Sequence, residues 1–304
     1  MSRVLVTGGA GFIGSHLVKE LVASGHDVGV LIRPGASIEK LQPMVGDVRA
    51  FRGDLDDPED AVSKLGEWRP ETCAHLAWYA EPRTYLQSAE NVSHLTSSLA
   101  LVTRLSDAGC RRFVITGTCA EYAPSQSRLG EDSPVGPQTL YAACKLSLQM
   151  VTAQLAAQSG MQVAWARIFH LYGPFEYEQR LVPAVIRRLL ANEDFAATSG
   201  EQVRDYLHVS DVASALCTLV EGRVDGTVNV CSGKEVTVRQ VIETIAEMLG
   251  RSDRVRFGAV AARAWDPPYI VGDNARLVGD GWSPRYDLRT GLAQTIEWWR
   301  ARQC

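Results

Sequence analysis

The sequence predicts an α/β fold in which a doubly wound parallel sheet is joined to a smaller C-terminal domain. Short apolar segments alternate with helix-forming segments from the first residues to about Phe169. These short segments are apolar throughout, which is typical of strands buried on both faces of a parallel sheet. Beyond the stretch "HLYGP", prolines separate shorter and less regular pieces, which indicates a second, smaller unit.

The elements can be placed in order along the chain. "SRVLVT" is the first strand, and "SHLVKELVASG", after a glycine turn, has helical spacing up to Gly25. Further strands are expected at "HDVGVLI", "VRAFRG", "TCAHLAW", "RRFVITG" and "QVAWARIF", with helices at "SSLALVTRLSDAG" and "TLYAACKLSLQMVTAQLAAQSG". We expect residues 1–170 to form the sheet domain, with a return segment near 203–232. Residues 171–202 and 233–304 then form the smaller domain.

Composition excludes several classes of function. The formal net charge is −4 over 304 residues and no basic run gathers in one segment, so we expect no nucleic-acid partner. No stretch of about twenty apolar residues exists, which predicts no membrane span. Because the chain begins directly with a strand, we expect no signal peptide. The seven scattered cysteines lack metal-ligand spacing and predict no metal site, and reduced thiols favour a cytoplasmic protein.

The first turn carries the pattern of a dinucleotide site. Gly8, Gly11 and Gly14 lie three residues apart between strand and helix, and Gly9 allows a second glycine register. In either register, bare backbone approaches a pyrophosphate and the free N–H groups at the helix start attract its charge. A glycine motif in this strand–turn–helix context predicts dinucleotide binding.

The end of the second strand indicates which dinucleotide is bound. A site for NAD offers an acidic residue there to the adenosine ribose, whereas this chain has Ile32 followed by Arg33. An arginine pairs with a 2′-phosphate, so NADP(H) is favoured and NAD(H) stays open. The alternative is that Arg33 is a solvated loop charge. Asp54 follows the third strand, where it either accepts from the adenine amino group or caps the next helix.

Tyr141 and Lys145 are four residues apart in a helix-forming run, so they share one face. A phenol normally ionises near pH ~10. A nearby ammonium and the positive nicotinamide ring both favour phenolate, and we expect them to lower the pKa of Tyr141. The phenol then exchanges a proton with a carbonyl or alcohol oxygen as hydride moves. Thr118, at the end of "RRFVITGT", is placed to hold the same oxygen.

With these residues the chain resembles the extended short-chain dehydrogenase/reductase family, the Rossmann-like branch of nucleotide-sugar epimerases, dehydratases and reductases. The resemblance runs from residue 7 to 299 and rests on these pieces: "TGGAGFIG", "GDLDD", "HLAW", "TGTCAEY", "YAACK", "RIFHLYGP", "RDYLHVSDVA" and "GWSPRYDLRTGLAQTIEWW". It implies Tyr141 as the acid/base, Lys145 on the nicotinamide ribose and Thr118 on the reacting oxygen. It also implies a homodimer in which the helix carrying Tyr141 and Lys145 packs with its neighbour into a four-helix bundle.

The resemblance defines two sets of binding residues. The smaller C-terminal domain is expected to bind a nucleotide sugar, with Arg204 on its diphosphate and Asp205 and Asp211 holding the guanidinium. Substrate contacts are expected from Tyr79, Thr118, His170 and Arg204. Cofactor contacts are expected from Gly8, Gly11, Phe12, Ile13, Gly14, Arg33, Asp54, Leu55, Leu76, Ala77, Tyr141, Lys145 and His170.

Two departures from the family pattern narrow the reaction. The 4,6-dehydratases follow the strand-end threonine with Asp and Glu, which expel water, but here the positions hold Cys119 and Ala120. Glu121 lies one residue out of step, so dehydration is not expected. Many members have Asn in place of His170, where the imidazole either contacts the substrate or packs under the turn. Aromatic residues replace small ones in "HLAWYAEPRTYL", where they either face a deoxysugar or pack.

Two redox reactions remain. A 4-ketoreductase uses fresh NADPH to reduce a nucleotide-linked 4-keto-6-deoxyhexose, and Arg33 favours this reaction. A nucleotide-sugar 4-epimerase instead keeps NAD tightly bound and returns the hydride to the opposite face of the sugar. Three other residues are expected to be structural: His75 as a packed strand-end histidine, Cys119 as a small filler and Arg180 as a surface helix charge.

Overall fold

The fold is built on a central sheet of seven strands. The computed structural model describes residues 2–261 and 266–303. All seven strands are parallel and are ordered β11-β6-β5-β4-β1-β2-β3. Their bounds are β1 Arg3–Thr7, β2 Asp27–Ile32, β3 Val48–Arg52, β4 Thr72–His75, β5 Arg112–Thr118, β6 Gln162–Ile168 and β11 Gly226–Val230. The predicted Rossmann-like, doubly wound α/β fold is confirmed, with its switch point between β1 and β4.

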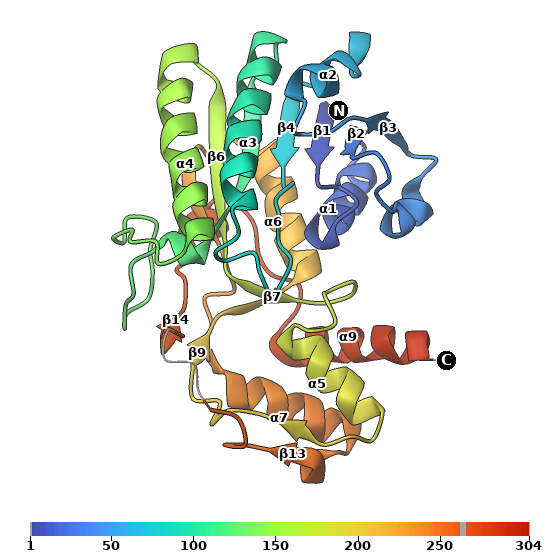
Figure 1. Cartoon of the computed structure of the whole chain (residues 1–304), viewed down its shortest axis with the longest axis vertical. Coiled ribbons are helices and arrows are strands. Elements are labelled where there is room, and N and C mark those ends of the chain that lie inside the picture. Colours follow the sequence, from blue (N-terminus) through green and yellow to red (C-terminus); the bar gives the residue numbers. More distant parts are fainter. Residues whose placement is uncertain (1, 262–265, 304) are drawn as a thin grey trace.

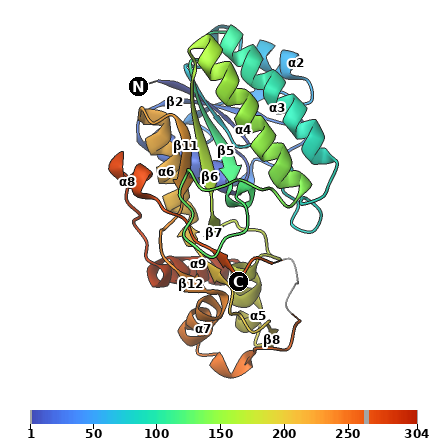
Figure 2. The same cartoon turned by 90° about the vertical axis from the view of Figure 1, so that its left-hand side faces the viewer.

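Helices cover both faces of the sheet (Figures 1 and 2). One face carries α1 (Phe12–Ala23) and α6 (Val209–Glu221), and the other carries α2 (Pro58–Ser63), α3 (Glu90–Asp107) and α4 (Leu140–Ser159). Strand side chains alternate between the two cores: Val4 and Val6 pack under α1, whereas Leu5 packs under α3 and α4. Burial on both faces explains why the central strands are mostly apolar, whereas the edge strand β3 is largely exposed and carries Arg49 and Arg52. We call the sheet and these helices the sheet lobe.

A second core lies beyond the carboxyl ends of the strands, which point toward it in Figure 1. It is formed by α5 (Leu181–Leu190), α7 (Val238–Leu249) and α9 (Leu288–Gln303). The remaining short elements are β7 His170–Tyr172, β8 Phe195–Ala196, β9 Val203–Arg204, β10 Tyr206–His208, β12 Val236–Thr237, β13 Val255–Arg256, β14 Tyr269–Ile270 and α8 Ala275–Gly279. We call the part built on this core the small lobe. The domain boundaries expected from sequence stay a proposal.

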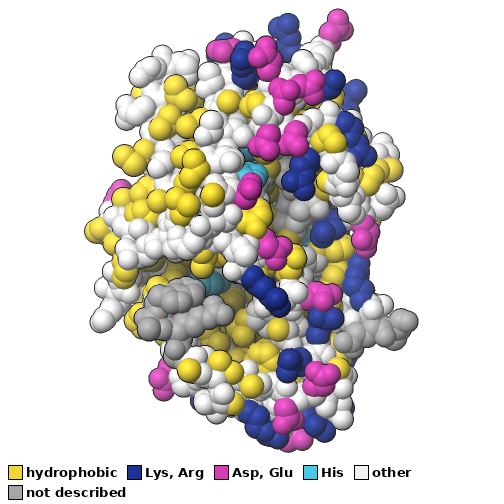
Figure 3. Space-filling view, in the orientation of Figure 1, with side chains coloured by type: hydrophobic (Ala, Val, Ile, Leu, Met, Phe, Trp, Pro, Cys, Tyr) yellow, Lys and Arg dark blue, Asp and Glu magenta, His cyan; other side chains and the backbone are white. Residues whose placement is uncertain are grey.

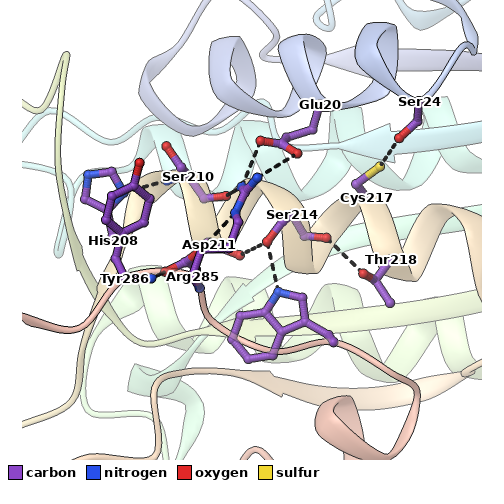
Figure 4. A network of polar contacts seen from close by, with 11 residues as sticks. Glu20, Ser24, His208, Ser210, Asp211, Ser214, Cys217, Thr218, Arg285 and Tyr286 are labelled. Carbon is purple, nitrogen blue, oxygen red and sulfur yellow. Dashed lines mark hydrogen bonds and ion pairs between the residues drawn. The ribbon is translucent and has the colours of Figure 1, made fainter. Parts of the chain in front are cut away.

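Asp211 joins the two lobes, as Figure 4 shows. Its carboxylate, in the first turn of α6, accepts from the backbone N–H groups of Arg285 and Tyr286 at 2.9 and 3.0 Å. The Arg285 guanidinium reaches on to Glu20 of α1, at 2.8 Å. The segment that leads into α9 is therefore fastened to both helices on one face of the sheet.

The described residues contain no helix that is long and apolar enough to cross a membrane. Six cysteines lie within the described ranges and all are free thiols. Cys304 lies outside those ranges.

Arg112 fixes the end of α6 to the sheet. Its side chain is buried at the start of β5 and donates to the Leu219 carbonyl from two nitrogens, at 2.9 and 2.7 Å. It also donates to the Val224 carbonyl at 3.1 Å and pairs with Asp225 at 3.2 Å. These carbonyls belong to the C-terminal end of a helix and the loop after it, where a cation is favourable and buried acceptors need donors.

We expect Arg112→Met to lower the free energy of unfolding by about 3 kcal/mol, because it leaves buried carbonyls without donors. Urea denaturation followed by circular dichroism measures this loss. The exposed neighbour Arg111 provides the matched control, and Arg111→Met should change the same free energy by less than about 0.5 kcal/mol. Equal effects of the two substitutions would show that the Arg112 contacts contribute little.

Candidate active site

The glycine turn between β1 and α1 is shaped for close approach of backbone. Gly8 has φ +71°, and a Cβ there would lie 2.7 Å from the Ala77 backbone nitrogen. A Cβ on Gly14 would lie 2.1 Å from the Gly8 carbonyl oxygen. The turn packs against the end of β4 and is closed by the Gly11 N–H, which donates to the Gly8 carbonyl at 2.9 Å. Any side chain at Gly8 or Gly14 would disrupt this cradle.

The same turn presents the start of α1. Gly11 is the N-cap, the first turn holds no acidic residue, and Phe12 and Ile13 are half-buried beside it. The first N–H groups of a helix lack partners within the helix, and the helix dipole adds partial positive charge there. The cradle and these groups together fit the pyrophosphate of a dinucleotide.

The adenosine end of the expected cofactor site is formed by β2 and β3. Ile32 is buried at the end of β2, and Arg33 is exposed directly after it. Asp54 accepts from the Asp56 backbone N–H at 3.2 Å, and Leu55 is half-buried beside it. Asp54 does not cap the next helix: the N-cap of α2 is Asp57, whose carboxylate accepts from the Asp60 N–H at 3.0 Å.

Thr118, Tyr141 and Lys145 come together at the carboxyl end of β5. The Lys145 ammonium donates to the Thr116 carbonyl at 2.8 Å, which anchors α4 against the strand that ends at Thr118. Thr139 caps α4 through the Ala142 N–H, at 3.2 Å. The Tyr141 N–H donates to the Leu86 carbonyl at 3.0 Å, which holds the backbone that carries the phenol in place.

Burial controls the protonation of this group. Burial raises the pKa of Tyr141 and the Tyr85 phenol adds to the rise, while a hydrogen bond with Thr118 opposes it. Burial lowers the pKa of Lys145 to about 7. In the protein alone burial outweighs any effect of the ammonium, so the pKa of the phenol is not lowered; the expectation for the site with nicotinamide bound stays a prediction. The ammonium itself is held by the Thr116 carbonyl and the Trp78 ring, whose centroid lies 3.9 Å from Nζ.

Aromatic side chains surround Tyr141. The Tyr85 ring meets it edge-on at a centroid distance of 5.0 Å, and the Trp78 ring lies 6.5 Å away. Buried Asn91 holds both, because its side chain accepts from Trp78 Nε1 at 2.8 Å and donates to the Tyr85 carbonyl at 2.6 Å. Tyr79 instead bonds to Thr84 in its own loop, at 2.7 Å. The sequence analysis did not predict the contact between Lys145 and Trp78.

Glu121 is a structural residue. Its fully buried carboxylate accepts from Arg167 Nε at 2.7 Å, Trp165 Nε1 at 3.0 Å and the Thr118 N–H at 2.8 Å. Both carboxylate oxygens therefore accept hydrogen bonds from groups of the protein itself. Half-buried Cys119 has a thiol whose pKa is raised by burial to about 12, so it is no thiolate nucleophile.

The small lobe contributes His170, Tyr206 and Arg204. The His170 and Tyr206 rings lie 5.7 Å apart on the paired strands β7 and β10. Burial lowers the pKa of His170 to about 3, with Arg204 adding to the effect, so the imidazole is neutral. Its Nδ1 is buried without a hydrogen-bond partner among the described residues. The surface is hollowed between the two lobes (Figure 3).

The expected partners of Arg204 are wrong. The buried guanidinium pairs with Asp266 at 2.6 Å. Asp205 accepts instead from Ser232, through both its backbone N–H and its hydroxyl at 2.7 Å. Asp211 is engaged by the segment before α9 (Figure 4). Sequence proximity misled because Asp205 lies between β9 and β10 and Asp211 lies on α6, where each carboxylate bonds to groups other than Arg204.

Arg180 and His75 complete the comparison with the sequence. Arg180 was expected to be a surface charge, but it is half-buried and its guanidinium lies 5.3 Å from the Tyr85 ring centroid. The expectation for His75 agrees with the structure, since its ring nitrogens bond Thr7 and Ser98 at 2.7 and 2.8 Å. Glu176, between β7 and α5, was not singled out in the sequence. Its only signal was an acidic residue in the segment crossing between the lobes.

A parallel sheet with a glycine turn at its switch point defines an α/β protein of the dinucleotide-binding class. The chain belongs to the NAD dependent epimerase/dehydratase family, whose model matches residues 4–231. The predicted resemblance is confirmed.

Similar proteins support this assignment. The UDP-glucose 4-epimerase of Corynebacterium glutamicum is 28% identical over 95% of this chain and 93% of its own. A dTDP-glucose 4,6-dehydratase of an Actinoplanes species is 30% identical over 99% and 98%. The structure of the Thermotoga maritima UDP-glucose 4-epimerase with UDP-glucose has a TM-score of 0.90 at 26% identity, covering 99% of this chain and 100% of that one. The chain is therefore similar to nucleotide-sugar enzymes over its whole length.

We expect Glu121→Gln to lower the free energy of unfolding by about 3 kcal/mol, because it leaves the buried Arg167 charge without its counter-ion. Urea denaturation measures the change. Glu193→Gln, at an exposed position after α5, should stay within about 0.5 kcal/mol of the parent. A parent-like midpoint for Glu121→Gln would remove the structural role assigned to this carboxylate.

Proposed function

We propose that this protein is an NADPH-dependent 4-ketoreductase of a nucleotide-linked 4-keto-6-deoxyhexose. The observation that carries the proposal is the grouping of Thr118, Tyr141 and Lys145 at the carboxyl edge of the sheet that also carries the glycine turn, with Cys119 and Ala120 following Thr118. The first three residues suit transfer of a proton during hydride chemistry. A thiol that stays protonated and a methyl group supply no acid/base pair for removing water.

Each of the three residues has a defined task. The bound nicotinamide supplies the hydride, which goes to the carbonyl carbon. The Tyr141 phenol gives its proton to the carbonyl oxygen, which becomes the product hydroxyl, and the Thr118 hydroxyl holds the same oxygen. Burial keeps the phenol protonated at neutral pH, which is the form that reduction needs. Lys145, with its pKa lowered to about 7, would bind the ribose of the nicotinamide and can return a proton to the phenol after turnover.

The choice of NADPH rests on the end of β2. An apolar buried Ile32 offers nothing to ribose hydroxyls, and the exposed Arg33 guanidinium is available for a 2′-phosphate. Asp54 and Leu55 would border the adenine of the bound cofactor, and Leu76 and Ala77 its nicotinamide half. His170 and Arg204 take the sugar and the diphosphate of the substrate, and Tyr79 lies at the rim.

A homodimer is part of the proposal. Helices α3 and α4 lie together on one face of the sheet and expose large apolar side chains: Met150 and Val151 on α4, and Val92 on α3. Figure 3 displays apolar side chains on the side of the molecule where α4 lies. Apolar surface on two adjacent helices supports association with a second copy.

A second candidate is a nucleotide-sugar 4-epimerase with tightly bound NAD. The relatives favour it, since two of the compared proteins are UDP-glucose 4-epimerases. The purified protein distinguishes the two reactions. Loss of NADPH absorbance on adding the keto sugar supports the reductase, and interconversion of two sugar nucleotides without added cofactor supports the epimerase.

We expect Tyr141→Phe to lower kcat for keto-sugar reduction by about 10²–10⁴-fold, because the proton donor is lost. NADPH binding, followed by nicotinamide fluorescence, should stay within about twofold of the parent. Tyr177→Phe is the control, since this exposed phenol bonds to Glu81 at 3.1 Å. Parent-like turnover by Tyr141→Phe would refute the assigned proton donor.

We expect Arg33→Gln to lower kcat/KM for NADPH by about 10–100-fold, through loss of charge-assisted hydrogen bonds worth about 1.5–3 kcal/mol. Steady-state rates with NADPH and NADH in the same variant measure this, and NADH serves as the internal control because it lacks the 2′-phosphate. Equal losses with both cofactors would contradict the assigned contact.

A further inference from the structure

The segment between β7 and α5 has a strained backbone. Phe175 has φ +71°, a left-handed conformation that bulky residues rarely adopt, and Gly173 just before it has φ +148°. Such a conformation costs about 1–3 kcal/mol and persists only where the surroundings impose it. The Phe175 ring is held 6.1 Å from His16 of α1 and 5.0 Å from Trp298 of α9. Packing from both lobes therefore fixes the direction of the next residue.

That next residue is Glu176, and one of its carboxyl oxygens is buried and forms no hydrogen bond within the described ranges of the chain. Oε2 is shielded from solvent and has no hydrogen-bond partner among the described residues. Burial raises the pKa of Glu176 to about 8, against the opposing effects of the Arg180 guanidinium and the Gly173 backbone N–H. A buried polar atom without a partner costs about 1–3 kcal/mol. The backbone strain at Phe175 and the unpartnered oxygen of Glu176 therefore both destabilise the folded chain, at two adjacent residues.

Three fully buried carboxylates among the described residues differ in this respect, whereas Asp280, at the end of α8, shares an unpartnered buried oxygen. Asp205 accepts from the Ser232 N–H and hydroxyl at 2.7 Å and from the Gly233 N–H at 2.9 Å. Asp211 and Glu121 are likewise bonded through both oxygens to neighbouring groups. Those three acids stabilise the fold, whereas the free oxygen of Glu176 contributes no such contact.

Glu176 lies near residues that the small lobe contributes to the candidate site. It raises the pKa of Tyr206, whose ring is paired with His170 at 5.7 Å. Arg180, whose charge opposes the rise in the pKa of Glu176, lies 5.3 Å from the Tyr85 ring, and Tyr85 meets Tyr141 at 5.0 Å. Arg180 and Tyr85 therefore lie between the surroundings of Glu176 and the proposed proton donor.

The chemistry of this position selects the group that binds there. An ionised carboxylate repels a diphosphate, and a protonated carboxyl both donates and accepts, so a neutral hydroxyl suits Glu176 in either state. Hexoses offer several such hydroxyls beside the reacting carbon. We propose that Glu176 is a specificity-determining residue whose free oxygen hydrogen-bonds a hydroxyl of the substrate's sugar ring. This inference rests on the proposed function, because it takes the ligand to be a nucleotide sugar.

Calorimetric titration of the full chain tests the contact. The probes are the UDP-, dTDP-, GDP- and CDP-linked glucoses and the four free nucleoside diphosphates. We expect Glu176→Met, which keeps the side-chain length but cannot hydrogen-bond, to bind the preferred nucleotide sugar at least about tenfold more weakly. Its affinity for the matching nucleoside diphosphate should be unchanged, and Glu176→Gln should retain part of the sugar affinity.

Thermal unfolding separates this role from a structural one. Removing an unsatisfied buried oxygen should leave the Tm of Glu176→Met equal to or above that of the parent. Glu178→Met is the matched control on the same segment, since Glu178 is exposed and forms an ion pair with Arg187; its sugar affinity should equal the parent's.

Three results would overturn the inference. They are unchanged sugar affinity in Glu176→Met, an equal loss for the sugar nucleotide and the nucleoside diphosphate, or a lower Tm together with weaker binding of both. Failure of the parent to bind any of the four sugar nucleotides would overturn the proposed function itself, and the inference with it. The parent's titration therefore distinguishes the two failures.

Discussion

The candidate site depends on the buried ion pair between Glu121 and Arg167. The Glu121 carboxylate binds the Arg167 guanidinium of β6 and also accepts from the Thr118 backbone N–H at the end of β5. The backbone that carries the Thr118 hydroxyl is therefore held in place. Because the pair is isolated from water, removing either charge would leave the other buried without a counter-ion. Through the Thr116 carbonyl the same strand also holds Lys145, and through Lys145 it holds the helix that carries Tyr141. A charge pair outside the chemistry thus sets the geometry on which the chemistry relies.

Burial then gives this geometry its electrostatic character. The phenol of Tyr141 lies among Trp78, Tyr85 and Thr118, where a negative charge is poorly stabilised and the proton is retained. Lys145 lies against the Trp78 ring, and its pKa is brought close to neutrality. The site therefore holds a protonated acid close to an amine whose pKa lies near neutrality, an arrangement suited to proton transfer.

Sequence patterns predicted the parts of the protein whose causes are local. The glycine turn, the seven-stranded parallel sheet's alternation with helices and the Tyr141–Lys145 spacing each reflect backbone geometry within a few residues. The partner of Arg204 was not predictable in this way, because Asp266 comes from a distant segment. The inward turn of Glu176 depends on packing of Phe175 against two lobes, and the protonation of Tyr141 depends on burial. No local pattern encodes either property.

Phe175 and Arg285 also determine how the molecule can move. The Phe175 ring is inserted between α1 and α9, and the Arg285 side chain bridges the small-lobe segment to Glu20 and to the Ser210 carbonyl. Hinge bending of the lobes would have to break both attachments at once. These two attachments therefore favour one fixed arrangement of the lobes, in which the groups on either side of the hollow keep their relative positions.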